Sequence, residues 1–258
     1  ASPSASPVDV PAPAAPTPQA TTATPDFDGD GKADLASTLE DDQEISQVRV
    51  TYGSGTTATT LGSADVLLAR NLNGDGYTDL VLADVDGTVS VLFGSPSGLE
   101  PSSKRSFGAS AFGTGHHPRA LALVEKPMPR LVVSASPGYG SKPGKLVVYT
   151  LAANGLPTSA APTVLQAGKG GVPKVSDLGS FGHALAGVGA QLFVGAPYAK
   201  VNGRTSAGAV VALTFSATGV KSGRLITQNT KGVGSTVAKG DNFGWSLAAR
   251  DGYLAVGA

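Results

Sequence analysis

Two short segments of the chain carry oxygen-bearing side chains at alternate positions around glycines. They are residues 26–35, Asp-Phe-Asp-Gly-Asp-Gly-Lys-Ala-Asp-Leu, and residues 71–80, Asn-Leu-Asn-Gly-Asp-Gly-Tyr-Thr-Asp-Leu. Ca²⁺ takes about six to eight oxygen ligands, and a short loop supplies them when every second side chain points inward and glycine permits the bend. Both segments meet this requirement, so the sequence predicts two calcium sites.

The first segment offers four carboxylates. Its predicted ligands are the side chains of Asp26, Asp28, Asp30 and Asp34 and the backbone carbonyl of Lys32, with Gly31 at the turn. An EF-hand loop would need a bidentate Glu at its twelfth position, and Ser37 stands there. The segment therefore predicts a calcium loop of a different kind, placed at a turn between strands.

The second segment repeats the pattern with fewer charges. Its predicted ligands are the side chains of Asn71, Asn73, Asp75 and Asp79 and the backbone carbonyl of Tyr77. Because ligand charge tunes affinity, we expect tighter binding at the first loop. The alternative for either segment is a turn held by hydrogen bonds from its own Asp and Asn side chains to the backbone. Where a metal binds, we expect it to be structural, since the clustered carboxylates would otherwise repel one another.

The amino-acid composition excludes several classes of function. The 258 residues include 19 basic and 19 acidic side chains, no cysteine and three histidines. A chain without net charge lacks the field that recruits nucleic acid or anionic lipid. The absence of cysteine excludes disulfides and thiolate chemistry. No stretch approaches the roughly 18 apolar residues of a membrane-spanning helix, so we expect neither nucleic-acid binding nor membrane insertion.

Residues 1–25 are nearly all Ala, Pro, Ser and Thr, with Asp9 as the only charge. Such a segment buries too little apolar surface to offset its ordering entropy, and we expect a disordered leader. Leaders of this composition are common directly after the cleavage site of exported bacterial proteins, which favours secretion. The alternative is an ordinary interdomain linker.

The remainder predicts an all-β protein, because short apolar runs alternate with Gly-rich breaks and no helical stripe persists. Asp86-Gly87 favours a two-residue hairpin turn. His116-His117 fits a solvated loop, and His183 fits the surface of a sheet. The strands expected from the pattern span 47–52, 79–83, 88–93, 119–124, 130–134, 145–149, 190–194, 209–215 and 253–257.

These strands repeat. Four apolar strands end in an aromatic residue and are followed by Gly directly or a few residues later. These segments are 48–53, 89–94, 146–156 and 210–220. A second marker, Phe-Gly, lies upstream of the later units at 112–113, 181–182 and 243–244, each time ahead of an apolar run that reads Ser-Ala-Ser-Pro, Gly-Ala-Pro or Gly-Ala. Spacings of roughly forty to seventy residues fit a four-stranded blade with its loops.

Phe-Gly followed by Gly-Ala-Pro, with Asp-x-Asp-Gly-Asp-Gly-x-x-Asp loops in some copies, resembles the FG-GAP (VCBS-like) repeat family of integrin α-chains and secreted bacterial proteins. The resemblance covers residues 26–258 and implies a β-propeller. The first two copies keep the acidic loop without Phe-Gly, and the later copies keep Phe-Gly with short turns instead. The expected blades lie near 26–60, 71–105, 112–165, 181–230 and, incomplete, 241–258.

Family propellers of this kind usually have about seven blades, and the fifth copy stops before its last strands. We therefore expect these four to five blades to be part of a longer polypeptide, because an unfinished blade leaves an open strand edge. The alternative is a smaller or irregular solenoid.

The sequence contains no Gly-x-Ser-x-Gly elbow, His-Glu-x-x-His helix or Walker loop. We therefore expect no enzymatic activity, but a secreted, monomeric, calcium-stabilised module that binds an extracellular protein or glycan through loops on rigid blades. The alternative is the propeller portion of a secreted hydrolase or surface enzyme whose catalytic residues lie elsewhere.

Overall fold

The computed structural model describes residues 24–40, 46–58, 61–108, 111–113, 115–137, 143–159, 161–174, 177–250 and 252–258. The expected leader therefore lies almost entirely outside the described residues. Within them the chain is all-β, as predicted, and its one helical element is a 3₁₀ turn at Pro101–Ser103. No helix in this part of the chain is long and apolar enough to cross a membrane.

The described strands form five antiparallel sheets in chain order, three of which have four strands. Neighbours in the chain are neighbours in the sheet, so each sheet is a meander. The first sheet contains β1 (Leu35–Glu40), β2 (Ser46–Thr51) and β3 (Thr57–Ala58); the second β4 (Val66–Arg70), β5 (Asp79–Ala83), β6 (Val89–Leu92) and β7 (Arg105–Phe107); the third β8 (His117–Val124), β9 (Arg130–Ser136), β10 (Lys145–Thr150) and β11 (Thr163–Leu165); the fourth β12 (Leu185–Val188), β13 (Gln191–Ala196), β14 (Ala209–Ser216) and β15 (Gly219–Ile226); and the fifth β16 (Ser246–Arg250) and β17 (Tyr253–Gly257).

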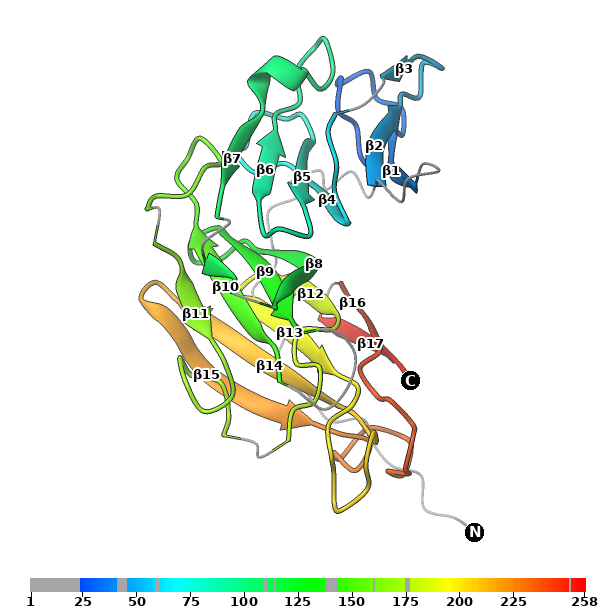
Figure 1. Ribbon diagram of the computed structural model, residues 1–258, viewed down its shortest axis with the longest axis vertical. Helices are drawn as coiled ribbons and strands as arrows, with labels where there is room; N and C mark the ends of the chain where they lie inside the picture. Colours follow the sequence, from blue (N-terminus) through cyan, green and yellow to red (C-terminus); the bar gives the residue numbers. More distant parts are fainter. Residues whose placement is uncertain are drawn as a thin grey trace.

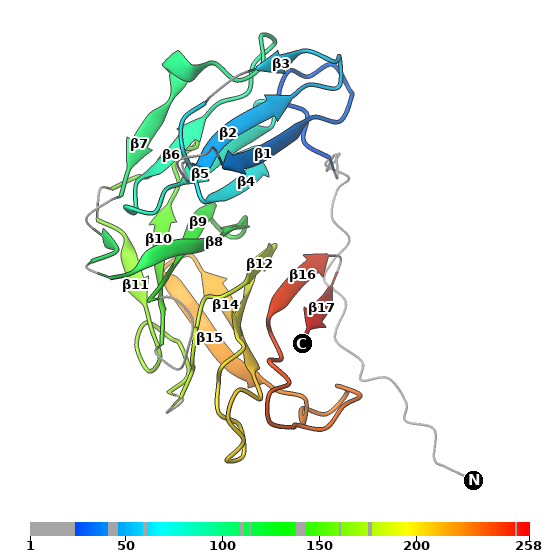
Figure 2. The same ribbon diagram turned by 45° about the vertical axis from the view of Figure 1, so that its right-hand side comes forward.

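Consecutive sheets pack face to face. Successive side chains of a strand point to opposite faces, so one strand can contribute to two cores. In β5, Leu80 and Leu82 join the cluster shared with the first sheet, whereas Val81 joins the cluster shared with the third. Four such clusters fill the spaces between the five sheets. Figures 1 and 2 show the sheets following one another along an arc.

The first strands of neighbouring sheets lie side by side, since β4 contacts β8, β8 contacts β12 and β12 contacts β16. Later strands of each sheet lie progressively farther from this inner row (Figure 2). The order within the sheets therefore places the first strands of the second to fifth sheets on one inner side of the arc.

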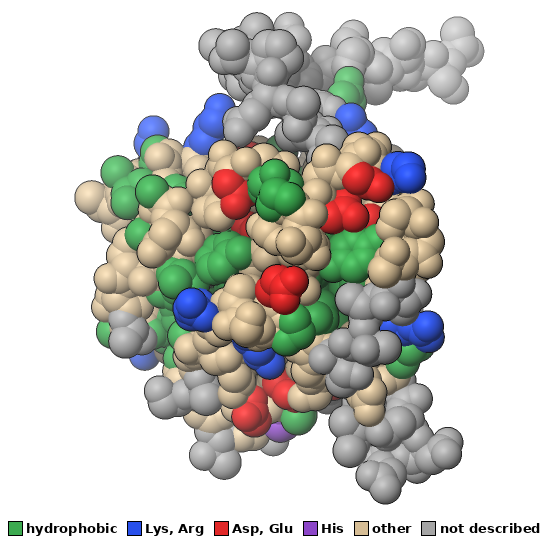
Figure 3. Space-filling model, turned by 90° about the horizontal axis from the view of Figure 1, so that it is seen from above, with side chains coloured by type: hydrophobic (Ala, Val, Ile, Leu, Met, Phe, Trp, Pro, Cys, Tyr) green, Lys and Arg blue, Asp and Glu red, His purple; other side chains and the backbone are tan. Residues whose placement is uncertain are grey.

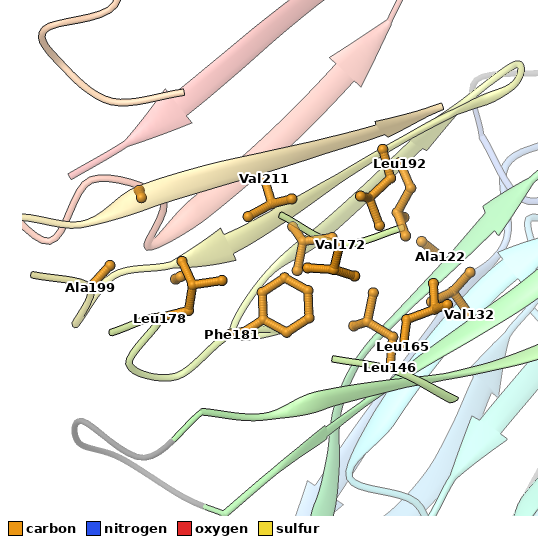
Figure 4. Packing of buried hydrophobic residues seen from close by; sticks show 14 of the residues in the cluster. Ala122, Val132, Leu146, Leu165, Val172, Leu178, Phe181, Leu192, Ala199 and Val211 are labelled. Atoms are coloured by element: carbon orange, nitrogen blue, oxygen red, sulfur yellow. The ribbon is translucent and has the colours of Figure 1, made fainter. Parts of the chain in front are cut away.

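Phe181 shows how a repeat marker builds the core. Its ring is fully buried in the cluster between the third and fourth sheets, among Val132 and Leu146 of one sheet and Leu192 and Val211 of the other (Figure 4). Phe243 occupies the corresponding cluster between the fourth and fifth sheets. The repeated Phe thus fills the space between two sheets.

The Phe-Gly and Gly-Ala markers are joined by hydrogen bonds. The Gly182 N–H donates to the carbonyl of Gly195 at 2.9 Å, and the Gly244 N–H donates to that of Gly257 at 2.9 Å. Gly182 and Gly244 have φ values of 94° and 95°, which L side chains rarely adopt. The Phe-Gly turn and the Gly-Ala strand end, about a dozen residues apart in sequence, are therefore in direct contact in each of these two repeats.

The pattern located the central strands of the sheets within one or two residues and missed most first and last strands. The missed strands include β4, β12, β15 and β16, in which most side chains are exposed or only partly buried. The Asp86-Gly87 hairpin also differs from the prediction. Its loop has three residues, with the Asp84 N–H bonded to the Thr88 carbonyl, and only Gly87 has a positive φ.

Candidate metal sites

The two acidic loops have equivalent positions in their sheets. The second joins β4 to β5, and its last ligand candidate, Asp79, is the first residue of β5. The first leads into β1, with the N–H of Asp34 bonded to the carbonyl of Pro25 at 2.7 Å. The first loop therefore leads directly into β1, and the second leads directly into β5, the equivalent strand of the next sheet.

Both loops fold by the same ladder of side-chain acceptors. In the first, the N–H groups of Gly29, Asp30 and Lys32 donate to the carboxylates of Asp26, Asp28 and Asp30 at 2.7, 3.2 and 2.8 Å. In the second, the N–H groups of Gly74, Asp75 and Tyr77 donate to the side chains of Asn71, Asn73 and Asp75 at 2.7, 3.1 and 2.9 Å. The alternate oxygen side chains thus shape each turn, whether or not a metal binds there.

The ninth-position carboxylates, Asp34 and Asp79, fasten the loops to the sheets. Asp34 accepts the N–H groups of Phe27 and Gly53 at 2.6 and 2.8 Å. Asp79 accepts those of Leu72 and Gly94 at 2.7 and 3.0 Å.

Gly53 and Gly94 thus hold the ninth-position carboxylates, a role not assigned to them from sequence. Their signal was present, because each glycine follows the aromatic end of a strand at the same place in both repeats. Asp79 is fully buried, and burial raises its pKa to about 6 against the opposing effect of its two N–H donors.

In the first loop the structure gathers three of the predicted ligands. One oxygen from each of Asp26, Asp28 and Asp34 lies within 4.8 Å of the others. Partial desolvation raises the pKa of Asp28, and repulsion from Asp34, Asp30 and Asp26 adds to this effect. Asp30 lies outside this group of three, and its carboxylate lies 3.7 Å from the Lys32 ammonium.

An all-oxygen, carboxylate-rich donor set of this kind suits a hard divalent cation such as Ca²⁺ and does not by itself identify which one. The second loop has two carboxylates, and the Asn73 amide donates to Asp75 at 2.8 Å. Weaker binding at the second loop stays a prediction from this lower charge.

The later sheets have short turns at the equivalent place. β12 and β13 are joined through Gly189 and Ala190 alone, and β8 and β9 through residues 125–129, which contain one carboxylate, Glu125. Neither turn has two acidic residues, so among the described residues the candidate metal sites lie in the first two sheets.

His183 is not on the surface, contrary to the prediction. Its side chain is 8% exposed, and its Nδ1 accepts a hydrogen bond from Arg119 Nε at 3.2 Å. Its ring lies 4.4 Å from that of Trp245, which also meets Tyr198 edge-on at 6.1 Å. Burial, with the Arg119 charge, lowers the pKa of His183 to about 4. The sequence missed this because Arg119 and His183 come from adjacent sheets.

His117 begins β8, where it is exposed and within 2.9 Å of the Val85 carbonyl through Nδ1. His116 borders an open hollow of about 210 Å³ together with Lys145 and Gln166. Its other described lining residues are Pro143, Gly144 and Ala167.

Charge on the end of the molecule shown in Figure 3 is dispersed. Acidic, basic and hydrophobic side chains are interspersed there, and Lys and Arg form no continuous patch on that face. No protein-family model matches the chain, and no curated protein matches it.

Proposed function

We propose that this chain is a calcium-stabilised β-propeller of the FG-GAP type that serves as a secreted, non-catalytic binding module. The observation that carries the proposal is the group of three carboxylates in the first loop, at the start of a series of face-to-face sheets. The inner row of first strands and the meander order within each sheet are the features that a propeller requires.

In this proposal Asp26, Asp28 and Asp34 hold the ion in the first loop, and Asn71, Asn73, Asp75 and Asp79 provide the weaker second site. The bound cation supplies the positive charge that offsets repulsion among the carboxylates. The ladder of N–H donors keeps the loop shaped for that cation, while Asp34 connects it to the end of β2 through Gly53. A stiffened loop and sheet then present the rim to a protein or glycan partner.

Calcium titration after chelator treatment tests the metal. At a Ca²⁺ concentration one hundred times Kd, linkage gives about 2.7 kcal/mol, which corresponds to a rise in Tm of about 5–10 °C for a chain of this size. The double variant Asp28→Ala/Asp30→Ala should lose most of that rise. Asp86→Ala, an exposed carboxylate in a different turn, is the matched control and should keep it. An unchanged wild-type melting curve would refute the metal assignment.

Partner binding needs its own measurement. The calcium-loaded chain, immobilised and exposed to a glycan array and to culture supernatant, should retain a ligand that the same chain releases or binds more weakly in chelator. Retention that is equal with and without chelator would show that the metal does not support the binding surface.

A further inference from the structure

The two acidic loops contact one another directly. The Thr78 N–H donates to the Asp26 carbonyl at 2.8 Å, and the Asp26 N–H donates to Thr78 Oγ1 at 3.1 Å. Asp26 is the first ligand candidate of its loop, and Thr78 lies between two ligand candidates of the other, Tyr77 and Asp79. One bond joins the two loop backbones, and the other joins the Asp26 backbone to the Thr78 hydroxyl.

A second connection links the ninth-position carboxylates. Asp34 accepts the Phe27 N–H, and the backbone carbonyl of Phe27 accepts the Ser95 N–H at 3.1 Å. The adjoining Gly94 N–H donates to Asp79. Three hydrogen bonds thus run from the carboxylate of one loop to the carboxylate of the other through Phe27 and residues 94–95.

The loops are closely packed where Gly29 meets Tyr77 and where Gly94 meets Thr78. A Cβ added to Gly29 would lie 2.5 Å from Cε1 of Tyr77, and one added to Gly94 would lie 2.3 Å from the Thr78 carbonyl oxygen. Thr78 itself is 9% exposed. A change in the backbone of one loop therefore alters the packing of the other.

We infer that the two loops bind Ca²⁺ cooperatively and that Thr78 is the residue that couples them. This inference rests on the proposed calcium binding and adds its regulation. An ion at one loop fixes peptide groups on which the other loop is built, so the second ion orders fewer groups and binds more tightly. Coupling between sites in proteins typically changes affinity by about 5- to 150-fold.

The test is isothermal titration calorimetry of the full chain with Ca²⁺ after chelator treatment, with circular dichroism to verify strand content. Disabling the second loop with Asn73→Ala/Asp75→Ala should weaken binding at the first loop by about fivefold or more. The Asp86→Ala control should leave both affinities unchanged. In a Thr78→Val background, which keeps the shape but removes the hydroxyl, the same second-loop changes should have less than about half of that effect.

Each outcome decides the inference. Two ions that bind with a first-loop affinity unaffected by Asn73→Ala/Asp75→Ala would overturn the coupling while leaving calcium binding intact. An equal fold-change in the Thr78 and Thr78→Val backgrounds would overturn the role of Thr78. No binding to the wild-type chain would overturn the proposed function and the coupling together.

Discussion

Asp79 combines two tasks at the scale of the single residue. Its carboxylate closes the second loop through the Leu72 N–H and fixes the end of β6 through the Gly94 N–H. The Asp79 side chain is fully buried. A carboxylate with two backbone donors satisfies groups that would otherwise be unpaired after burial. The same arrangement at Asp34 indicates that this position serves the fold as well as any cation.

Asp79→Ala should therefore destabilise the chain even in chelator. Two buried N–H groups lose their acceptor, which costs about 1–3 kcal/mol each, or about 2–6 kcal/mol in total. Thermal unfolding followed by circular dichroism measures the change, with Asp86→Ala as an exposed-carboxylate control. A Tm equal to that of the control in chelator would mean that Asp79 has no structural role apart from metal.

His183 makes stability depend on pH. Its pKa is about 4 in the folded chain and near 6.5 when unfolded, so the unfolded state binds the additional proton between these values. The stabilisation from neutral His183 is complete above pH 6.5 and is lost as pH falls toward 4. The charged group that faces the ring is Arg119, which the imidazolium would repel.

The comparison of wild-type and His183→Gln melting curves from pH 7 to 4.5 isolates this contribution, because Asp79 titrates equally in both. The wild-type Tm should fall more steeply below pH 6.5. Parallel curves would show that His183 keeps the same pKa in both states.

At the scale of the element, the Phe181-Gly182 and Phe243-Gly244 turns pack on strands of the preceding sheet. A Cβ added to Gly195 in β13 would lie 2.1 Å from the Gly244 carbonyl oxygen of the next repeat. That distance is shorter than any real Cβ contact, so the strand and turn must separate if a side chain is present. The glycine of Gly-Ala-Pro therefore sets the spacing between two sheets.

Gly195→Ala should lower Tm by more than Gly189→Ala does. Gly189 has a φ of 55° with nothing near its added Cβ, so its substitution costs about 1 kcal/mol of backbone strain. Gly195→Ala adds overpacking of about 1–3 kcal/mol. Differential scanning calorimetry of the two variants measures the difference, and equal shifts would contradict the close approach.

Sequence patterning predicts the central strands well and the edges poorly, for a physical reason. Buried strands such as β5 and β13 must be apolar on both faces, and this leaves a continuous run in the sequence. Outer strands such as β15 carry Lys221 and Arg224 on exposed faces and read as loop. The alternate oxygen side chains revealed the two loops, but contacts between repeats, such as Thr78 with Asp26, have no local signature.

At the scale of the whole molecule, the described sheets form a chain of nearest-neighbour contacts. Each of the four apolar clusters belongs to one pair of consecutive sheets. The stability of such an array is approximately the sum of the contributions of its sheets and interfaces. A substitution that weakens one interface therefore destabilises the two adjoining sheets first.

Phe243→Ala tests this modularity. The substitution removes a buried ring from the cluster between the fourth and fifth sheets and should cost about 3–5 kcal/mol. The fifth sheet contributes to this one cluster only, which it shares with the fourth sheet. Hydrogen exchange should therefore show lost protection in β16 and β17 while β5 and β9 stay protected. Leu92→Ala, between the first and second sheets, should give the reverse pattern, with β1 and β2 exposed first. Loss of protection that is uniform over all sheets in both variants would show instead that the array unfolds as one cooperative unit, held by contacts beyond those between neighbours.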